Sequence, residues 1–415
     1  MTKPEANPKR RAKAPRKPSG PTMLAVAEAA KVSIFTVSAV LNGTSVVSDE
    51  RRERVEEAIR LTGYKRNAVA RSLKTGRTQT VGVIIGDITN PFYTDVVAAI
   101  QQVLYRAGYG VALCCNDRDV TLQEDHIAVL RDRMVDGLII SPTGNDARLR
   151  AALERTRLPV VLVDRLVEGL DCDAVIIDNR SAVHGALRYV ISLGHRRIGF
   201  ISGMLDSFTG RERLAGYCET LEEYGIAREP ALVQLGNFRI DEAYNATLRL
   251  MTSADPPTAI FASNNQMVIG VMKALNHLKL SCPEDVSVAG IDDFPWADAF
   301  RPQLTTVAQP VRAIGEQAAQ LLLERFDGRA NGKGRRIVLS GELKVRESCC
   351  RMPARLRAAA PPGRHSRKLL PGDCRRQRLQ PGHGGRFCAH SRGGWSMGVP
   401  PPVLGDRSDR PSALS

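Results

Sequence analysis

The sequence lacks the long apolar runs of membrane and exported proteins. No stretch of its 415 residues approaches the about 18 consecutive apolar residues of a membrane-spanning helix. Residues 1–20 are basic and proline-rich, without the apolar centre of a secretory signal. The nine cysteines are odd in number and form no C-x-x-C pair, so they imply neither a disulfide framework nor a zinc site. Reduced thiols in a cytoplasm fit this pattern best.

The signatures of common enzyme classes are also missing. The chain has no G-x-G-x-x-G, no P-loop, no G-x-S-x-G and no H-E-x-x-H. Its seven histidines are scattered, and solvated or core positions account for His126 and His195 better than catalysis does. We therefore expect no catalytic residue, no metal and no cofactor.

Positive charge is abundant but uneven. Residues 1–22 carry a net charge of +6 and residues 352–415 carry +9, which together equal the +15 of the chain. Residues 23–351 are thus neutral overall, yet residues 23–78 carry +4 within them. A small basic N-terminal unit beside a larger, mildly acidic one favours DNA contact by the former.

Both ends of the chain have the composition of disordered segments. Residues 1–21 form a basic arm, which either adds non-specific attraction to phosphates or has no role beyond solubility. Residues 351–415 are rich in arginine, proline and glycine and show no apolar period. We interpret this tail as an appended or out-of-frame, non-native translation; a basic nucleic-acid-binding tail is the alternative.

Two short helices joined by a tight turn begin the ordered part. Apolar and small residues predict a helix over 24–30, and Ser33 is a good N-cap for a second helix two residues later. Helices so closely joined cross steeply, as in a helix-turn-helix, whose second helix can enter a DNA major groove. Val37 and Val40 or Leu41 should face inward. The positions left outward are Ile34, Phe35, Ser38, Ala39 and Asn42. A helical hairpin within an ordinary core fits the same residues.

A third helix and a short capped segment follow. Ser48 caps the third helix and Gly63 closes it. Asn67 then caps residues 68–73, a segment too short to be a stable helix alone. We expect it to become helical only on contact with a partner; a flexible connector is the alternative.

From Thr80 onward apolar runs alternate with helical stretches in the βαβ manner. The predicted strands are 81–85, 111–114, 137–140, 160–163, 174–177, 198–201, 232–235, 259–262 and 286–291. The predicted helices are 93–107, 122–134, 146–155, 182–193, 211–224, 241–251, 266–278 and 311–325. Near-continuous valine and isoleucine indicate parallel sheets buried on both faces. Their number exceeds one ordinary sheet and predicts two Rossmann-like lobes.

Ligands of such folds bind at the carboxyl ends of the strands. Polar and aromatic side chains recur there, among them Asp164-Arg165 and Asn264-Asn265-Gln266. They suit a small polar ligand such as a sugar or a nucleobase-like ring, although any one of them is more commonly solvated or capping.

Several motifs occur in a specific order. They are V-S-I-F-T-V-S-A-V-L-N-G, V-S-D-E-R-R-E-R-V, G-Y-K-R-N-A-V-A-R-S-L-K-T-G-R-T, I-T-N-P-F-Y, V-D-G-L-I-I, L-G-H-R-R-I-G-F-I-S-G, P-T-A-I-F-A-S-N-N and D-V-S-V-A-G-I-D-D. Over residues 22–348 the chain resembles the lac repressor / galactose repressor family of bacterial transcription regulators. The resemblance implies a small all-α helix-turn-helix domain (22–66), a hinge helix and linker (67–78), and an α/β, two-lobed, periplasmic-binding-protein-like domain (79–350).

The resemblance also implies partners and sites. We expect a cytoplasmic homodimer, with a tetramer as the alternative, that binds double-stranded operator DNA and acts as a repressor. It should hold a small-molecule effector, a sugar or related metabolite, between its lobes. The DNA-binding residues it implies are Ser33, Ile34, Phe35, Thr36, Ser38, Ala39, Asn42, Asn67 and Leu73. The effector-binding residues it implies are Asn90, Phe92, Tyr93, Asp164, Thr209, Arg213, Phe238, Asn265 and Asp292.

The chain departs from the family pattern at a few positions. The resemblance implies that Ile34, Phe35 and Ala39 face the bases. Ala39 stands where the family usually has an arginine that reads guanine, so these three positions are all apolar. They must rely on thymine methyls and DNA shape. Lys31 replaces the usual turn glycine, Arg66 the proline before the hinge, and Asn265 a common aspartate. A solute-binding protein of a transport system shares the lobes but has no use for a helix-turn-helix; an α/β enzyme is the third possibility.

Overall fold

The computed structural model describes residues 21–43, 46–64, 76–144, 147–330 and 332–352. The expected hinge residues Asn67 and Leu73 lie outside this range, as do both terminal segments, 1–20 and 353–415. In the described part, no single helix is long and apolar enough to cross a membrane. Two helices, 23–30 and 34–41, reach that length and apolar content only when taken together, and they are bent by 105°.

Three helices form the N-terminal domain: α1 (Met23–Ala30), α2 (Ile34–Asn42) and α3 (Asp49–Thr62). The axes of α1 and α2 are bent by 105°, the steep crossing expected of a helix-turn-helix. The side chains of this core are small; they are Val26, Ala27, Ala30, Val37, Val55 and Ala58. Val40 and Leu41 pack against them, so the predicted inward face of α2 is confirmed.

Local capping fixes where these helices begin and end. The Ser33 hydroxyl accepts a hydrogen bond from the Thr36 amide at 3.1 Å and starts α2. Lys31 ends α1 in the left-handed region, with φ 53° and ψ 45°, and Gly63 ends α3 at φ 63°. Ser48 precedes α3 without a side-chain capping bond. The turn therefore places a lysine where backbone geometry favours glycine.

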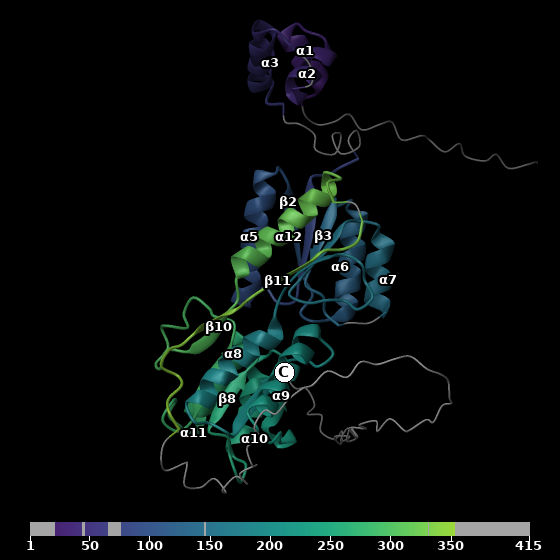
Figure 1. Ribbon diagram of the computed structural model, residues 1–415. Helices are drawn as coiled ribbons and strands as arrows, with labels where there is room; N and C mark the ends of the chain where they lie inside the picture. Colours follow the sequence, from purple (N-terminus) through teal and green to yellow (C-terminus); the bar gives the residue numbers. More distant parts are fainter. Residues whose placement is uncertain (1–20, 44–45, 65–75, 145–146, 331, 353–415) are drawn as a thin grey trace, which may run out of the picture. The chain divides into compact units, whose positions relative to one another are not determined.

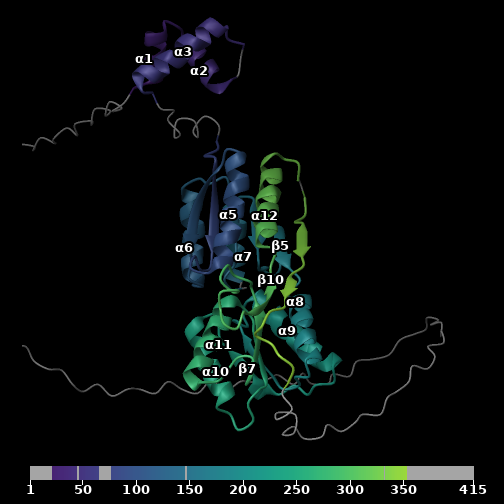
Figure 2. The same cartoon turned by 90° about the vertical axis from the view of Figure 1, so that its left-hand side faces the viewer.

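Lobe 1 is a parallel six-stranded sheet with helices on both faces (Figure 1). Its strand order is β11-β5-β4-β3-β1-β2. The strands are β1 (Thr80–Ile85), β2 (Gly110–Cys115), β3 (Gly137–Ile140), β4 (Val160–Val163), β5 (Asp173–Ile177) and β11 (Arg336–Leu339). The helices are α5 (Pro91–Arg106), α6 (Val120–Asp132), α7 (Ala147–Thr156) and α12 (Val311–Phe326). Figure 2 shows α5 and α12 side by side on one face; α6 and α7 pack on the other.

Lobe 2 repeats this plan, in the strand order β12-β10-β9-β8-β6-β7. The strands are β6 (Ile198–Ser202), β7 (Val233–Leu235), β8 (Ala259–Ala262), β9 (Ser287–Ile291), β10 (Thr305–Ala308) and β12 (Glu342–Lys344). Helices α8 (Asn179–Ser192) and α9 (Phe208–Glu223) cover one face, and α10 (Ile240–Met251) and α11 (Asn265–Leu278) the other. A 3₁₀ turn, η1 (Pro230–Leu232), precedes β7.

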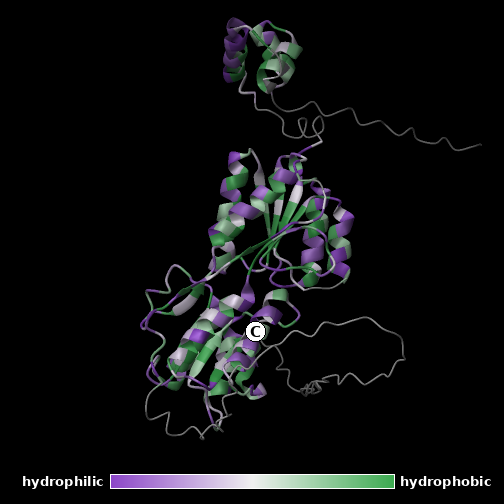
Figure 3. Cartoon of the chain, in the orientation of Figure 1, coloured by the Kyte–Doolittle hydropathy of each residue, from purple (hydrophilic) through white to green (hydrophobic). Residues whose placement is uncertain are grey.

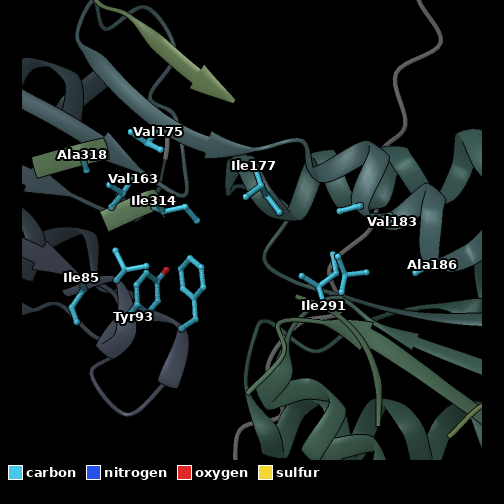
Figure 4. Close-up of a cluster of buried hydrophobic side chains, with 14 of the residues drawn as sticks. Ile85, Tyr93, Val163, Val175, Ile177, Val183, Ala186, Ile291, Ile314 and Ala318 are labelled. Atoms are coloured by element: carbon cyan, nitrogen blue, oxygen red, sulfur yellow. The ribbon is translucent and has the colours of Figure 1, made fainter. Parts of the chain in front are cut away.

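The strands are buried because they are sandwiched between helices. Figure 3 shows hydrophobic strands inside each lobe and helices with mixed faces around them. One cluster of buried side chains extends across both lobes, from Ile85 and Val163 in lobe 1 to Val183 and Ile291 in lobe 2 (Figure 4). The prediction of two α/β lobes is confirmed.

The chain passes between the lobes three times, after β5, after β10 and after β11. The prediction of purely parallel sheets is wrong in one place, because β12 pairs antiparallel with β10. Strands β10, β11 and β12 were not predicted. Strands β11 and β12 are short edge strands with exposed positions, so they lack the continuous apolar run that identifies a strand buried on both faces.

Candidate functional site

Helix α2 presents two large apolar side chains to solvent. Ile34 is 50% exposed and Phe35 is 75% exposed, although both belong to the first turn of the helix. Exposed large side chains at the start of the second helix of a helix-turn-helix are in the position that contacts base edges. Nearby, the Ser33 and Thr36 hydroxyls lie 2.9 Å apart, within hydrogen-bond distance. The side chain of Asn42 lies outside the described residues.

Ala39 does not fit the prediction that it faces outward. It is only 4% exposed, whereas Ile34 and Phe35 on the same helix are open to solvent. Ala39 therefore offers little surface to a base, and the exposed apolar surface at the start of α2 comes from Ile34 and Phe35.

A small cavity lies between the two lobes, at the carboxyl ends of several strands. Its volume is about 20 Å³, which is room for about one water molecule. Side chains from both lobes line it, and most are polar or charged. They are Asn90, Phe92, Tyr93, Arg118, Asp164, Arg165, Thr209, Arg213, Phe238, Asn264, Asp292 and Gln309.

On the lobe 1 side, a chain of hydrogen bonds runs through Tyr93. Its hydroxyl donates to Asp164 Oδ2 at 3.2 Å and accepts from Ser141 Oγ at 3.2 Å. Arg165 Nε lies 3.3 Å from the same Asp164 oxygen. Burial raises the pKa of Tyr93 to about 12, so this hydroxyl stays protonated and remains a donor.

On the lobe 2 side, a buried guanidinium and a buried carboxyl line the cavity. Arg213 donates from Nε to Asn179 Oδ1 at 2.7 Å and from a terminal nitrogen to the Ser263 carbonyl. Asp292 Oδ1 accepts from the side-chain amide of Gln309. Burial raises the pKa of Asp292, because a buried carboxylate loses its hydration, while nearby Arg213 opposes the shift.

Four cavity residues hold a backbone conformation that residues other than glycine rarely adopt. The φ angles are 64° at Arg118, 66° at Asp164, 59° at Phe238 and 71° at Asp292. Strain of this kind persists where the surrounding structure enforces it, and it gathers at functional sites. Each of these residues follows a strand or the turn after it, where the strained turn carries the residue to the cavity wall.

Direct contacts hold the two lobes against each other around the cavity. Asn265 Nδ2 of lobe 2 donates to Asn90 Oδ1 of lobe 1 at 2.9 Å. A terminal nitrogen of Arg118 donates to the Phe238 carbonyl at 3.3 Å, and the Arg165 guanidinium stacks 5.3 Å from the centre of the Phe238 ring. Polar contacts of this kind favour a closed arrangement and must rearrange when the lobes separate.

Eight of the nine expected effector-binding residues line this one cavity. The ninth, Asn265, is buried beside it and bonds to Asn90 instead. The expected effector-binding set left out four lining residues, Arg118, Arg165, Asn264 and Gln309. Arg165 and Asn264 are among the polar side chains expected to follow strands, whereas Arg118 and Gln309 were not predicted at all.

Two family models match the chain. One, described as bacterial regulatory proteins of the lacI family, matches residues 22–67. The other, a periplasmic binding protein-like domain, matches residues 187–349. The two models cover the helix-turn-helix region and most of lobe 2.

Individual relatives align with this chain over nearly the whole of their own length. The HTH-type transcriptional repressor PurR of Vibrio atlanticus (strain LGP32) is 35% identical over 313 residues, which is 75% of this chain and 94% of the relative. PurR of Haemophilus influenzae (strain PittEE) is 34% identical over 333 residues, covering 79% and 98%.

Solved structures of transcription regulators also resemble this chain. The lac repressor dimer bound to operator and the anti-inducer ONPF superimposes with a TM-score of 0.73 at 28% identity, covering 80% of this chain and 100% of that one. The complex of the transcriptional regulator CelR with cellobiose gives a TM-score of 0.61 at 33% identity, covering 79% and 99%. The chain is therefore a member of the lacI family of bacterial regulatory proteins, a DNA-binding transcription repressor that responds to a small-molecule effector and not an enzyme.

Proposed function

We propose that this repressor acts in the cytoplasm as a homodimer on a near-palindromic operator, with residues 22–66 as the DNA reader, 67–78 as the hinge and 79–350 as the effector sensor. The observation that carries the proposal is the exposure of Ile34 and Phe35 on a capped helix inclined by 105° to its predecessor. Two such helices on a twofold axis would enter successive major grooves.

The proposed DNA-binding side chains of α2 and its N-cap fall into a polar group and an apolar group. Ser33, Thr36, Ser38 and Asn42 have groups suited to phosphate oxygens, while Ile34 and Phe35 have only apolar surface for bases. Apolar side chains discriminate by contact with the thymine methyl. We therefore expect an operator whose outer positions are rich in A·T pairs, with further selection by DNA shape at the hinge, where Asn67 and Leu73 would act in the minor groove.

The effector would act through the angle between the lobes. Of the related structures named above, that of CelR contains the sugar cellobiose and that of the lac repressor contains the anti-inducer ONPF. The cavity of this chain is lined with hydrogen-bonding groups that suit a sugar or related metabolite. A ligand larger than one water must separate the lobes or shift side chains, because the cavity is only about 20 Å³. Its binding energy would then select one lobe angle over another.

Operator selection followed by fluorescence anisotropy tests the reader. Phe35→Ala should weaken binding to the selected operator by about 1–3 kcal/mol and leave the salt dependence unchanged, since no phosphate contact is lost. Leu61→Ala is the matched control, because Leu61 on α3 is also 75% exposed. Equal effects of the two variants, or none from Phe35→Ala, would exclude α2 as the base-reading element.

The hinge is tested separately. Leu73→Ala should reduce operator affinity, because the wedge that stabilises a kinked minor groove is lost. Unchanged affinity would show that the hinge assignment is wrong while leaving the assignment of α2 intact.

A further inference from the structure

The inter-lobe cavity holds more cationic groups than the described carboxylates neutralise directly. Arg118 and Arg165 each have a carboxylate within ion-pair distance. Arg213 does not: among the described residues its guanidinium is bound by two neutral oxygens, Asn179 Oδ1 and the Ser263 carbonyl. Arg213 is only 3% exposed, so its charge is buried without a direct counter-charge.

The one further carboxyl that lines the cavity, Asp292, forms no ion pair with Arg213 among the described residues. Asp292 interacts electrostatically with Arg213 and accepts hydrogen bonds from the Gln309 side chain and the Asn265 backbone. Burial raises the pKa of Asp292 and so favours its neutral form. A buried guanidinium beside a carboxyl that resists ionisation is complementary to an anion supplied from outside.

Two buried oxygens of the same cavity have no hydrogen-bond partner among the described residues. They are Thr209 Oγ1 and Gln309 Oε1, and both side chains line the cavity wall. Thr209 lies four residues before Arg213 on α9, so the hydroxyl and the guanidinium share one face of the helix. A threonine hydroxyl can donate to an anionic oxygen, and an amide oxygen can accept from a ligand hydroxyl.

The aromatic surface is less available than its position in the cavity suggests. The face of the Phe238 ring is covered by the Arg165 guanidinium at 5.3 Å, and Arg118 binds the carbonyl of the same residue. A planar base that stacked on Phe238 would have to displace Arg165 from both this ring and Asp164. The cavity therefore offers no open stacking surface for a planar ring.

We propose that the effector is an anionic, hydroxyl-bearing small molecule, a sugar acid or sugar phosphate, whose anionic group binds Arg213 and Thr209 while a hydroxyl reaches Gln309 and Asp292. The inference rests on the proposed effector-controlled function and narrows its ligand class. A guanidinium binds carboxylate or phosphate oxygens through two parallel hydrogen bonds. Such a ligand would bond to the Thr209 hydroxyl and the Gln309 oxygen and would bring a counter-charge to Arg213.

Calorimetric titration of the full-length protein with matched ligands tests this. The panel pairs gluconate and glucose 6-phosphate with glucose, and galacturonate with galactose, and adds guanine as a planar base. At least one acid should bind about 10- to 100-fold more tightly than its neutral parent, the range expected for a charge-assisted hydrogen bond. Comparing gluconate with glucose 6-phosphate shows whether the site prefers a carboxylate or a phosphate.

Arg213→Gln should abolish this preference for the acid. Arg180→Gln is the matched control, because Arg180 is an exposed arginine whose ion pairs, with Glu212 and Glu219, lie within lobe 2. Thr209→Val keeps the side-chain shape and should weaken acid binding several-fold. If circular dichroism shows that Arg213→Gln does not fold, Thr209→Val tests the site in its place. Preferential binding of guanine or a neutral sugar, no binding by any acid of the panel, or an acid preference that survives both cavity variants would overturn the inference.

Operator affinity measured on the same samples separates this inference from the proposed function. A neutral ligand that changes operator affinity would leave the proposed function standing and refute the anionic effector. If the unmodified protein showed no specific operator binding, the proposed function itself would be refuted.

Discussion

Replacing Lys31 by glycine should stabilise the helix-turn-helix domain. Lys31 ends α1 with φ 53° and ψ 45°, a left-handed conformation that costs a residue with a Cβ about 1–2 kcal/mol. Glycine adopts it freely but loses about 0.4–1 kcal/mol more through the entropy of the unfolded chain. The Lys31 side chain is exposed, and the capping bonds come from its backbone N–H, so both survive. The net gain should be about 1 kcal/mol.

That gain is large for so small a domain. Three of the six residues in its core, Ala27, Ala30 and Ala58, contribute only a methyl group. A core of this kind buries little apolar surface, so the domain is marginally stable and a change of about 1 kcal/mol is a sizeable fraction of its stability.

Native-state hydrogen exchange of the full-length protein measures the effect. Amides of α1 and α2 should exchange about fivefold more slowly in Lys31→Gly, since each 1.4 kcal/mol is a factor of about ten. Lys31→Ala should show no such gain, because alanine retains the Cβ. Lys279→Gly is a second control: Lys279 ends α11 at φ 56°, so its substitution should protect α11 and leave α1 unchanged.

Unchanged or faster exchange in α1 of the Lys31→Gly protein would refute the reasoning. So would equal protection from Lys31→Ala, because the benefit would then come from loss of the lysine side chain and not from backbone strain.

Other perturbations test the lobes. The Asp173 carboxylate binds Arg325 and Arg335, which hold its pKa well below the usual range; Asp173→Asn should cost about 2 kcal/mol at pH 7, discounted because Arg335 is 41% exposed. The stabilisation is present above the unfolded pKa of about 3.9 and lost as pH falls through the lower folded value, so the gap in thermal stability should close on acidification. Asp292→Asn should raise the melting temperature at pH 7 but not at pH 3, because burial raises the pKa of Asp292 and the ionised form is penalised only as pH rises above the unfolded value. Gly203→Ala should displace the Phe238 ring within lobe 2, since the added Cβ would lie 1.9 Å from Phe238 Cζ. The ring would then lose its contact with Arg165 of lobe 1, and the lobes should open, seen as a larger radius of gyration in X-ray scattering. An unchanged radius would show that this contact does not hold the lobes closed.

The strands of the two lobes were predictable because of where they lie. The prediction placed β3, β4 and β8 at their observed bounds, since a strand buried on both faces must be apolar throughout. Strand β11 alternates exposed and half-buried residues at a sheet edge, and β12 is three residues long. Their pairing depends on partners far away in the chain, which local patterns do not encode.

The candidate site was predictable in part for a similar reason. Residues that follow strands could be found once the strands were placed, and eight of nine converge on the cavity. Gln309 could not be found this way, because it follows β10, a strand the sequence did not reveal. Ala39 was misplaced, since helical periodicity predicts the direction of a side chain but does not give its exposure in the folded domain.

The positions of the crossing segments suggest how a ligand signal reaches the lobe angle. Asn179, which accepts from Arg213, begins α8 directly after the first crossing. Gln309, which donates to Asp292, lies on the second crossing between β10 and α12. Two of the groups proposed to bind the effector, Arg213 and Asp292, are thus bonded to two of the three segments that cross between the lobes. A ligand that competes for Arg213 and Asp292 changes the hydrogen bonds of those segments directly, so binding and lobe rotation are coupled without a longer pathway through the core.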